Sequence, residues 1–432
     1  MICENIAINE KGHLTFAGKD TLELAESFST PLYLMDEAKI RNNCRTYLDA
    51  FRDFLPKGSK PCYASKACSF KQLYRIMQEE GMGVDVVSRG EMYTAFQAGF
   101  DMSQVFFHGN NKTDEDLLAA IEMGVGVIVA DNIEEISAID RIAGEQGLCQ
   151  KIFIRITPGI DTHTYEAVNT GKVDSKFGSA IETGAALDIV AFALGCRHIS
   201  LEGLHCHVGS QVFEEDVFER SACVMLDFIK EVKENLGFTV KGLNLGGGYG
   251  VRYVDCDPHI DIRAKIKSVA ASIRCTCAEL GLDFPVIYME PGRSIVADAG
   301  MTLYTVGSVK RIPGFKNYVS IDGGMTDNPR YALYRSKYTV LNAGRATEEC
   351  SLGCTLAGRC CESGDLIAEN INLPEDTSRG DVIAVCTTGA YNYSMASNYN
   401  RLPRPAVVML SDNGPYVAVK RESLEDIIRN DI

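Results

Sequence analysis

Eight short apolar runs, rich in β-branched residues, recur along the first 300 residues and are separated by helical patterns. Polar or glycine-rich residues follow almost all of these runs, and only the fourth run, at 125–130, lacks such an end. Alternating strands and helices predict a parallel sheet. Eight such units, with their polar residues at the strand C-termini, predict a closed (β/α)8 barrel whose site is assembled from many strand ends.

The pattern changes in the last third of the chain. After residue 300 the long helical patterns mostly disappear, and alternating runs separated by glycine turns take over, which predicts a second, β-rich domain. A strand near the N-terminus is expected to join its sheet, because chain ends often lie close together. We therefore expect a barrel domain over 36–300 and a β-rich domain formed by 1–35 and 301–432.

Helical periodicity predicts where the longer helices lie. Asp36 is a candidate N-cap for a helix that runs to Phe54. Further helices are expected at 21–28, 132–146, 179–194, 214–236 and 260–280. The connection from Gly159 to Ser179 is rich in Gly, Thr and Asp, and a loop of that length after a strand is usually functional or mobile.

The charge balance excludes several classes of partner. The chain has 432 residues and a formal net charge of −15, which argues against nucleic acid and anionic membrane surfaces, because both bind basic patches. No apolar run reaches the length of about 18 residues that a transmembrane helix needs. The N-terminus lacks the basic and apolar regions of a signal peptide. We expect a cytoplasmic protein without a nucleic-acid or membrane partner.

The chain contains sixteen cysteines, which in a cytoplasmic protein are usually reduced thiols rather than disulfides. They cluster at 275–277, 350–354 and 360–361. None of these clusters has the paired C-x2-C spacing of a structural zinc site. The sequence therefore predicts no metal.

Lys66 follows the first strand, within Tyr63-Ala64-Ser65-Lys66-Ala67. A single lysine is normally a solvated surface charge. In a barrel mouth, apolar neighbours would partly desolvate the amine and favour its neutral, nucleophilic form. Lys66 is therefore a candidate for Schiff-base chemistry.

A glycine cluster, Gly246-Gly247-Gly248, follows the seventh strand. Glycine turns often do no more than reverse the chain. After strand seven of a barrel, however, their free N–H groups form a phosphate cradle. The cluster is not the G-x-x-x-x-G-K-S/T pattern of a nucleotide-binding loop, so ATP is not expected.

The sixth and eighth strands also end in polar residues, at His207-Val208-Gly209-Ser210 and Glu290-Pro291-Gly292-Arg293. Glu290 and Arg293 could form a plain ion pair. A carboxylate there can instead hold a protonated pyridine nitrogen, and an arginine can bind phosphate or carboxylate. An imidazole can stack on an aromatic ring, and Ser210 can donate to phosphate. A lysine, a phosphate cradle, a pyridinium partner and a stacking ring together describe pyridoxal 5′-phosphate (PLP).

This ordered set resembles the PLP-dependent decarboxylases that have an alanine-racemase-like barrel. The segments that carry the resemblance span nearly the whole chain, and the last three are the more specific: 63–67, 207–211, 246–248, 290–293, 330–334, 361–365 and 389–391. The sequence departs from the family at Cys68, where Asn is usual, and at Tyr331, where Pro is usual. Arg335 and Ser336 replace small residues.

The resemblance implies a role for each matching residue. Lys66 would hold the cofactor covalently, Glu290 would pair with its pyridine nitrogen and His207 would stack on its ring. The phosphate would be held by Ser210, Gly246, Gly247, Gly248 and Tyr391, and further cofactor contacts are implied for Asp85, Gly292 and Arg293. The retained substrate carboxylate would meet Arg293, Arg330 and Tyr334, with Tyr391 also in the substrate site.

Two further residues are implied to act across a dimer interface. Glu362 would take the distal ammonium of the substrate, and Cys361 would supply the proton that replaces CO2. In the family both come from the partner subunit, so a homodimer with shared active sites is implied.

The resemblance implies decarboxylation of meso-2,6-diaminopimelate to L-lysine, a step of lysine biosynthesis. Related decarboxylases act on ornithine, arginine or carboxynorspermidine, but three carboxylate-binding groups plus Glu362 suit a distal amino-acid group better than a simple amine. A non-catalytic PLP-binding regulator would need the lysine but not Cys361. A racemase would need a second catalytic base, and this alternative stays open.

Overall fold

The computed structural model describes residues 1–160 and 175–432. The chain forms two compact units: a barrel unit of 43–250 and 260–292, and a β-rich unit of 1–42, 251–259 and 293–432. Compared with the expected boundaries, the segments 36–42, 251–259 and 293–300 group with the β-rich unit.

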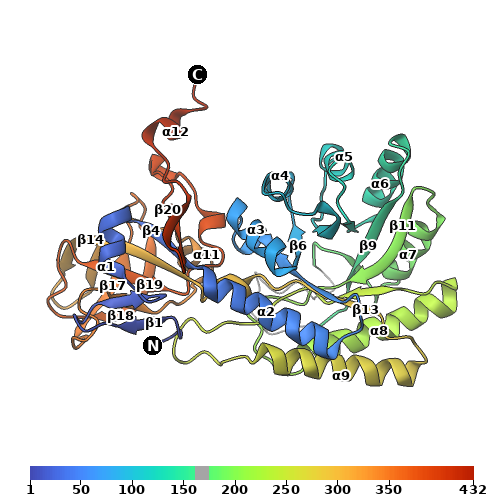
Figure 1. Cartoon of the computed structure of the whole chain (residues 1–432), viewed down its shortest axis with the longest axis horizontal. Helices are drawn as coiled ribbons and strands as arrows, with labels where there is room; N and C mark the ends of the chain where they lie inside the picture. Colours follow the sequence, from blue (N-terminus) through green and yellow to red (C-terminus); the bar gives the residue numbers. More distant parts are fainter. Residues whose placement is uncertain (161–174) are drawn as a thin grey trace. The chain divides into compact units, whose positions relative to one another are not determined.

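The barrel unit is built on eight parallel strands (Figure 1). They are β5 (Lys60–Ala64), β6 (Gly83–Val86), β7 (Val105–Phe107), β8 (Val127–Ala130), β9 (Gln150–Thr157), β11 (Ile199–His205), β12 (Gly242–Asn244) and β13 (Val286–Met289). Pairing of β8 with β9 and of β13 with β5 closes the ring. The predicted (β/α)8 barrel is therefore confirmed.

The helices of this alternation are α2 (Glu37–Phe54), α3 (Lys71–Glu80), α4 (Arg89–Gln97), α5 (Asp114–Glu122), α6 (Ile133–Glu145), α7 (Ala185–Gly195), α8 (Val217–Leu236) and α9 (Ile262–Leu280). Polar N-caps start several of them; Asn132, for example, accepts from the backbone N–H of Glu135. The helix expected at 179–194 begins later, because 179–180 form the short strand β10 and Gly184 is left-handed. Most of the connection expected at 159–179 lies outside the described residues.

Apolar side chains from different strands fill part of the barrel interior. Cys62, Phe106, Val129 and Phe153 form one buried cluster, in which the two phenylalanine rings meet edge to face at 5.4 Å. Strands buried on both faces read as continuous apolar runs. Polar side chains are therefore concentrated at the strand ends.

The β-rich unit contains two sheets. One joins β1 (Ile6–Ile8), β2 (Leu14–Phe16) and β3 (Lys19–Asp20). The larger runs in the order β18-β17-β15-β14-β4-β20-β21, and β19 pairs with β14 and β16. Its strands are β4 (Leu32–Asp36), β14 (Gly300–Arg311), β15 (Asn317–Ile321), β16 (Val340–Asn342), β17 (Leu352–Ala357), β18 (Leu366–Leu373), β19 (Val382–Cys386), β20 (Ala406–Ser411) and β21 (Gly414–Val419).

The expected N-terminal strand does join the larger sheet, through pairing of β4 with β14 and β20. Short helices complete the unit: α1 (Thr21–Phe28), α10 (Arg293–Val296), α11 (Arg330–Tyr334) and α12 (Leu424–Ile428). Across the described part of the chain, no helix combines the length and the apolar character needed to cross a membrane.

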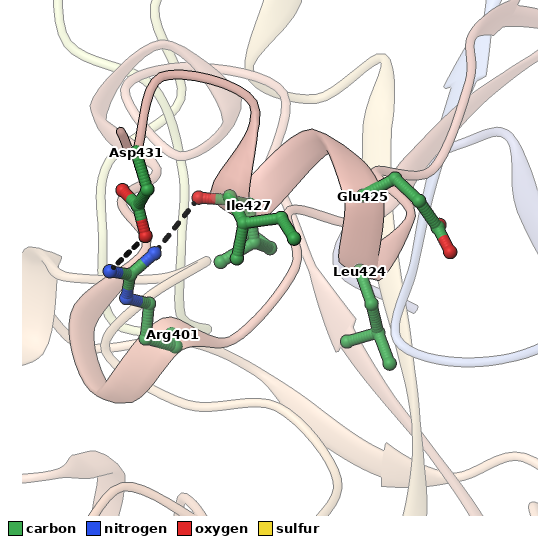
Figure 2. Close-up of a pocket in the computed structure, with 6 residues that line it drawn as sticks. Arg401, Leu424, Glu425, Ile427 and Asp431 are labelled. Carbon is green, nitrogen blue, oxygen red and sulfur yellow. Dashed lines mark hydrogen bonds and ion pairs between the residues drawn. The ribbon is translucent and has the colours of Figure 1, made fainter.

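A pocket lies beside α12 in the β-rich unit (Figure 2). Arg401 donates to the carbonyl oxygen of Ile427 at 3.0 Å and to Asp431 at 2.8 Å, while Leu424 and Glu425 also line the pocket. None of the residues predicted for the functional site lines it. The candidate site is therefore built from other parts of the chain.

Candidate functional site

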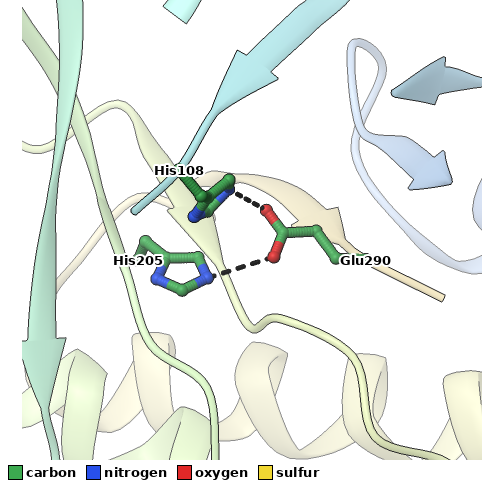
Figure 3. A group of neighbouring side chains, drawn as sticks. All are labelled: His108, His205 and Glu290. Carbon is green, nitrogen blue, oxygen red and sulfur yellow. Dashed lines mark hydrogen bonds and ion pairs between the residues drawn. The ribbon is translucent and has the colours of Figure 1, made fainter. Parts of the chain in front are cut away.

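A buried carboxylate, Glu290, lies directly after β13 in the barrel unit. Its Oε1 accepts a hydrogen bond from Asn244 Nδ2 at 2.6 Å and lies 2.7 Å from His108 Nε2. Its Oε2 lies 3.2 Å from His205 Nε2 (Figure 3). Asn244 and His205 end β12 and β11, and His108 directly follows β7, so four strand ends supply this network.

The network keeps Glu290 ionised. Burial alone would raise the pKa of Glu290, but His108 and His205 outweigh burial and hold that pKa well below its usual range. Burial lowers the pKa of His205 to about 3, although Glu290 opposes the shift. His205 is therefore neutral at neutral pH, and its Nε2 carries the proton donated to Glu290.

The two carboxylate oxygens of Glu290 have different numbers of close partners. Oε1 has two close partners, Asn244 and His108, whereas Oε2 has only His205 among the described residues. A carboxylate oxygen accepts two hydrogen bonds. Oε2 can therefore accept one more hydrogen bond, and a protonated ring nitrogen could donate it.

The carboxylate of Asp85 lies near this network. It lies on β6, is buried, and its Oδ1 is 3.9 Å from His108 Nε2. Burial raises the pKa of Asp85 to about 6, and Glu290 adds to the shift while His108 opposes it. The pKa of Asp85 therefore lies close to neutral pH.

His108, His205 and Glu290 also have the ligand types of a metal site, which the cysteine spacings did not indicate. Their ligand atoms lie within 4.8 Å of one another. The side-chain nitrogen of Asn244, which is a donor and offers no lone pair, points at the same carboxylate. The surroundings of Glu290 are thus those of an anion held by hydrogen-bond donors.

The predicted phosphate cradle follows β12. Gly247 N donates to His207 Nδ1 at 3.2 Å, and burial lowers the pKa of His207 well below its usual range, so the neutral ring carries its proton on Nε2. A Cβ at Gly247 would lie 2.0 Å from the carbonyl oxygen of Glu290, and Gly248 has φ +126°. Only glycine fits this turn. Gly246 N also donates, to Asn244 Oδ1 at 2.9 Å, so the N–H groups of Gly246 and Gly247 are not free, contrary to expectation, and Gly248 is the half-buried member of the cluster.

Lys66 lies in a 3-10 turn, Ser65–Ala67, that follows β5. Its neighbours are buried but Lys66 itself is exposed, so the expected partial desolvation of its amine is not seen. The preceding residue, Ser65, is buried, and its Oγ donates to Glu91 at 2.8 Å. Gly292, after β13, is buried against Ala64 and Ala67.

A second group of predicted residues meets in the β-rich unit, where two buried arginines lie among tyrosines. Arg330 Nη1 donates to Tyr338 OH at 2.9 Å, and Arg293 Nη1 donates to Tyr253 OH at 2.7 Å. The Arg293 guanidinium lies 4.8 Å from the ring centre of Tyr391. We call Arg293, Arg330, Tyr253, Tyr338 and Tyr391 the arginine–tyrosine cluster.

The cluster stabilises positive charge in a buried place. Burial alone would lower the pKa of Arg330, but Tyr253 and Tyr338 outweigh burial and raise it. Burial opposes ionisation of Tyr253, yet the two arginines hold its pKa below its usual value. Arg330 is only 6% exposed, and no carboxylate within 1–160 or 175–432 forms an ion pair with it. Buried charges are usually paired, so this cluster is suited to an anionic ligand.

The remaining predicted residues are three in the β-rich unit, Tyr334, Cys361 and Glu362, and one in the barrel unit, Ser210. Tyr334 is half-buried at the end of α11. Cys361 and Glu362 are exposed between β17 and β18, and the N–H of Cys361 donates to Asn400 Oδ1 at 2.7 Å. Ser210 is half-buried after β11.

The residues that depart from the family pattern have structural surroundings of their own. Cys68 is buried, which raises the pKa of its thiol. Tyr331 donates to Glu369, and the Arg335 guanidinium lies 5.3 Å from the Tyr331 ring. Arg335 itself is exposed and left-handed at the end of α11.

Sequence reasoning assigned no role to five residues that the structure adds to these groups: His108, His205, Asn244, Tyr253 and Tyr338. The first three lie at or just after strand ends, a position that could have identified them. Tyr253 and Tyr338 carry no such positional signal.

Comparison with known proteins agrees with this geometry. Residues 37–297 match the model of a family described as "Pyridoxal-dependent decarboxylase, pyridoxal binding domain". The match covers more than half of the chain, which therefore belongs to the pyridoxal-dependent decarboxylases.

Within that class, the similarity is to diaminopimelate decarboxylases over the full length. The chain is 44% identical to the Bacillus subtilis diaminopimelate decarboxylase over 426 residues, covering 98% of this chain and 96% of the relative. It is 43% identical to the Staphylococcus aureus one over 99% of both chains.

Solved structures agree. The diaminopimelate decarboxylase of M. jannaschii superimposes with a TM-score of 0.91 at 34% identity, covering 100% of this chain and 98% of the other. That of Helicobacter pylori, complexed with L-lysine, gives 0.85 at 31% identity, covering 95% and 98%.

Proposed function

We propose that this chain decarboxylates meso-2,6-diaminopimelate to L-lysine and CO2 with PLP as cofactor. The observation that carries the proposal is that each unit contains a buried charged group, and that the two groups are opposite in sign. Glu290 is an ionised carboxylate with one free acceptor position, and Arg330 is a buried cation without a carboxylate partner among the described residues. The first suits a pyridinium ring, and the second suits a substrate carboxylate.

The barrel unit would bind the cofactor. PLP, when bound, supplies a protonated ring that accepts the electron pair left when CO2 departs. Lys66 would hold it covalently, His207 would stack on its ring and Glu290 Oε2 would accept the ring N–H proton. Ser210, Tyr391 and the N–H of Gly248 would hold its phosphate, and Gly246 and Gly247 would lie beside it, because their N–H groups already donate to Asn244 and His207. Asp85, Gly292 and Arg293 would make further contacts.

The arginine–tyrosine cluster would bind the carboxylate that the substrate retains. Arg330 offers a planar set of donors that can hold a carboxylate through two hydrogen bonds. Arg293, Tyr334 and Tyr391 would complete this contact, and Glu362 would take the ammonium beside the same carboxylate. A diamine or simple amino acid lacks that second carboxylate, which favours diaminopimelate over ornithine and arginine.

Cys361 would supply the proton that replaces CO2. It is exposed, whereas its neighbour Cys360 is buried and burial raises the pKa of the Cys360 thiol to about 12. We propose that Cys361 and Glu362 complete the site of a partner subunit in a homodimer. All sixteen cysteines are free thiols, as is typical of reducing compartments, so we place the enzyme in the cytoplasm.

The test is a substrate comparison. Purified protein with PLP should release CO2 and L-lysine from diaminopimelate, and much less CO2 from ornithine, arginine or carboxynorspermidine. Equal turnover of ornithine would contradict the substrate assignment. A change of stereochemistry without CO2 would indicate a racemase, and cofactor binding without any turnover would indicate a regulator.

A further inference from the structure

A buried carboxylate in the β-rich unit, Asp365, accepts hydrogen bonds from a segment 40 residues earlier in the chain and from the turn that precedes it. Its Oδ1 accepts from Met325 N at 2.6 Å, and its Oδ2 accepts from Cys360 N at 2.7 Å. Met325 lies in segment 323–330, which leads into Arg330, and Cys360 directly precedes Cys361. One side chain thus holds two pieces of backbone, one five residues before Arg330 and the other directly before Cys361.

The fit around this carboxylate leaves no spare room. A Cβ at Gly324 would lie 2.6 Å from the Asp365 oxygens, and one at Gly358 would lie 2.2 Å from Oδ2. Arg359 N also donates to the carbonyl oxygen of Gly323 at 2.9 Å, which joins the two segments directly. Both backbones therefore approach the carboxylate as closely as glycine allows.

The contacts also separate two adjacent cysteines. Asp365 holds the backbone of Cys360, whose side chain is buried, and the next residue, Cys361, is exposed. The N–H of Cys361 is held in turn by Asn400 Oδ1. The direction in which Cys361 faces therefore depends on this arrangement of its backbone.

We propose that Asp365 is a positioning residue that clamps segment 323–330 to segment 358–365, and so sets the backbone that carries Arg330 and the backbone that carries Cys361. The proposal rests on the proposed function for the roles of Arg330 and Cys361. The clamp itself is a statement about two backbone segments and can be tested without turnover.

The first test is hydrogen exchange, followed by mass spectrometry, on full-length Asp365→Asn. The amide is the same size as the carboxylate, but whichever way it faces, its N–H2 group opposes one of the two donors. The arrangement in which Asp365 holds both segments should lose stability. The hydrogen-exchange rates of the backbone amides in 323–330 and in 358–365 should then rise together, by about tenfold or more. Asp381→Asn is the matched control, because Asp381 accepts from Ser378 N and Asn342 and touches neither segment.

Three results would overturn the clamp. In the first, exchange rises in only one of the two segments, and in the second it rises in neither. In the third, exchange rises equally in β14 and β19, which would indicate general destabilisation. If Asp365→Asn does not fold, the unmodified protein provides the test: the amides of Met325 and Cys360 should open with the same dependence on denaturant. Different dependences would show that the segments open independently.

The kinetic test separates positioning from general stability. For diaminopimelate, Asp365→Asn should raise KM, because Arg330 is displaced, and lower kcat, because Cys361 is displaced, each by about tenfold. The affinity for PLP should stay unchanged. A variant that is merely less stable would contain less active protein but keep its KM. If the wild type does not decarboxylate diaminopimelate, the proposed function fails while the exchange experiment still decides the clamp.

Discussion

The barrel unit and the β-rich unit each contain a buried charged group, and the two groups are opposite in sign. In the barrel, the anion Glu290 is surrounded by donors from Asn244, His108 and His205. In the β-rich unit, the cations Arg293 and Arg330 are surrounded by phenol groups. The first environment complements a protonated ring and the second complements a carboxylate, so each unit is suited to a different part of the proposed reaction.

The two regions also differ in where their residues come from. The Glu290 network uses strand ends, which a closed barrel brings to one mouth whatever the sequence between them. The arginine–tyrosine cluster uses an irregular segment (Tyr253), two short helices (Arg293 and Arg330) and loop residues near β16 and β19. Barrel geometry supplies the first set, and only the particular tertiary packing supplies the second.

The largest effect is expected in the barrel. Lys66→Ala removes the only side chain proposed to bind the cofactor covalently, so turnover should fall by at least about 10³-fold. Borohydride treatment and peptide mass spectrometry should find the cofactor on Lys66 in the wild type and on no lysine in the variant. Lys71→Ala, an exposed lysine in the first turn of α3, is the control and should behave as wild type. If the reduced cofactor is found on another lysine, Lys66 is not the attachment site, and the cofactor role proposed for the strand ends of the barrel fails.

The next effect separates substrate binding from cofactor binding. Arg330→Ala should raise KM for diaminopimelate by roughly 10- to 150-fold, the loss expected for a charged hydrogen bond of about 1.5–3 kcal/mol. The affinity for PLP should hardly change. Arg335→Ala, five residues on and exposed, is the matched control. An equal loss of PLP and substrate affinity in Arg330→Ala would make Arg330 a structural residue.

Much of the fold was predictable because burial leaves a simple pattern in the sequence. Parallel strands buried on both faces read as apolar runs, and caps such as Asn132 mark helix starts. After residue 300, sequence alternation indicates β14 to β16 and β19 to β21 but not β17 and β18. β18 is an edge strand whose exposed face carries polar residues, and Asn370 within it has φ +55°, which interrupts the alternation.

The candidate site was predictable to a smaller extent. Glu290 and the glycine cluster follow strands and have residue types that suggest their chemistry. Asn244 and His205 lie at equivalent positions, but their meaning depends on Glu290 being their neighbour, which only the closed barrel establishes. Arg330 and Cys361 were identified through resemblance alone, because long-range packing in the β-rich unit leaves no local signal.

Glu290 and Asp327, one buried carboxylate from each unit, differ in the direction of their pKa shifts, which predicts a pH effect. Glu290 is held ionised, whereas burial raises the pKa of Asp327 to about 7, although Tyr304 and Gly324 donate to it. Above the unfolded pKa of about 3.9, the folded protein retains a proton that the unfolded chain releases, so stability falls as pH rises toward 7. The loss from this group between pH 5 and 7 is on the order of 2 kcal/mol.

Asp327→Asn removes the titrating group. Its unfolding free energy, relative to wild type, should therefore improve by about 2 kcal/mol between pH 5 and 7, as measured by denaturant unfolding at both values. Asp412→Asn, on an exposed turn, is the control and should show no such change. A flat difference for Asp327→Asn would mean that Asp327 is ionised at pH 5, and the contrast with Glu290 would disappear.

The smallest effect tests whether the two units act across a dimer. Lys66→Ala and Cys361→Ala should each be nearly inactive. Mixed under conditions that exchange subunits, they should form heterodimers in which one shared site carries both substitutions and the other carries neither. Random mixing makes half of the dimers heterodimers, each with one intact site of two, so activity should recover to at most about one quarter of wild type. This limit follows from symmetry and needs no estimate of contact energy. If activity does not recover although exchange is demonstrated by mass spectrometry, Lys66 and Cys361 act within one chain, and each subunit holds a complete site.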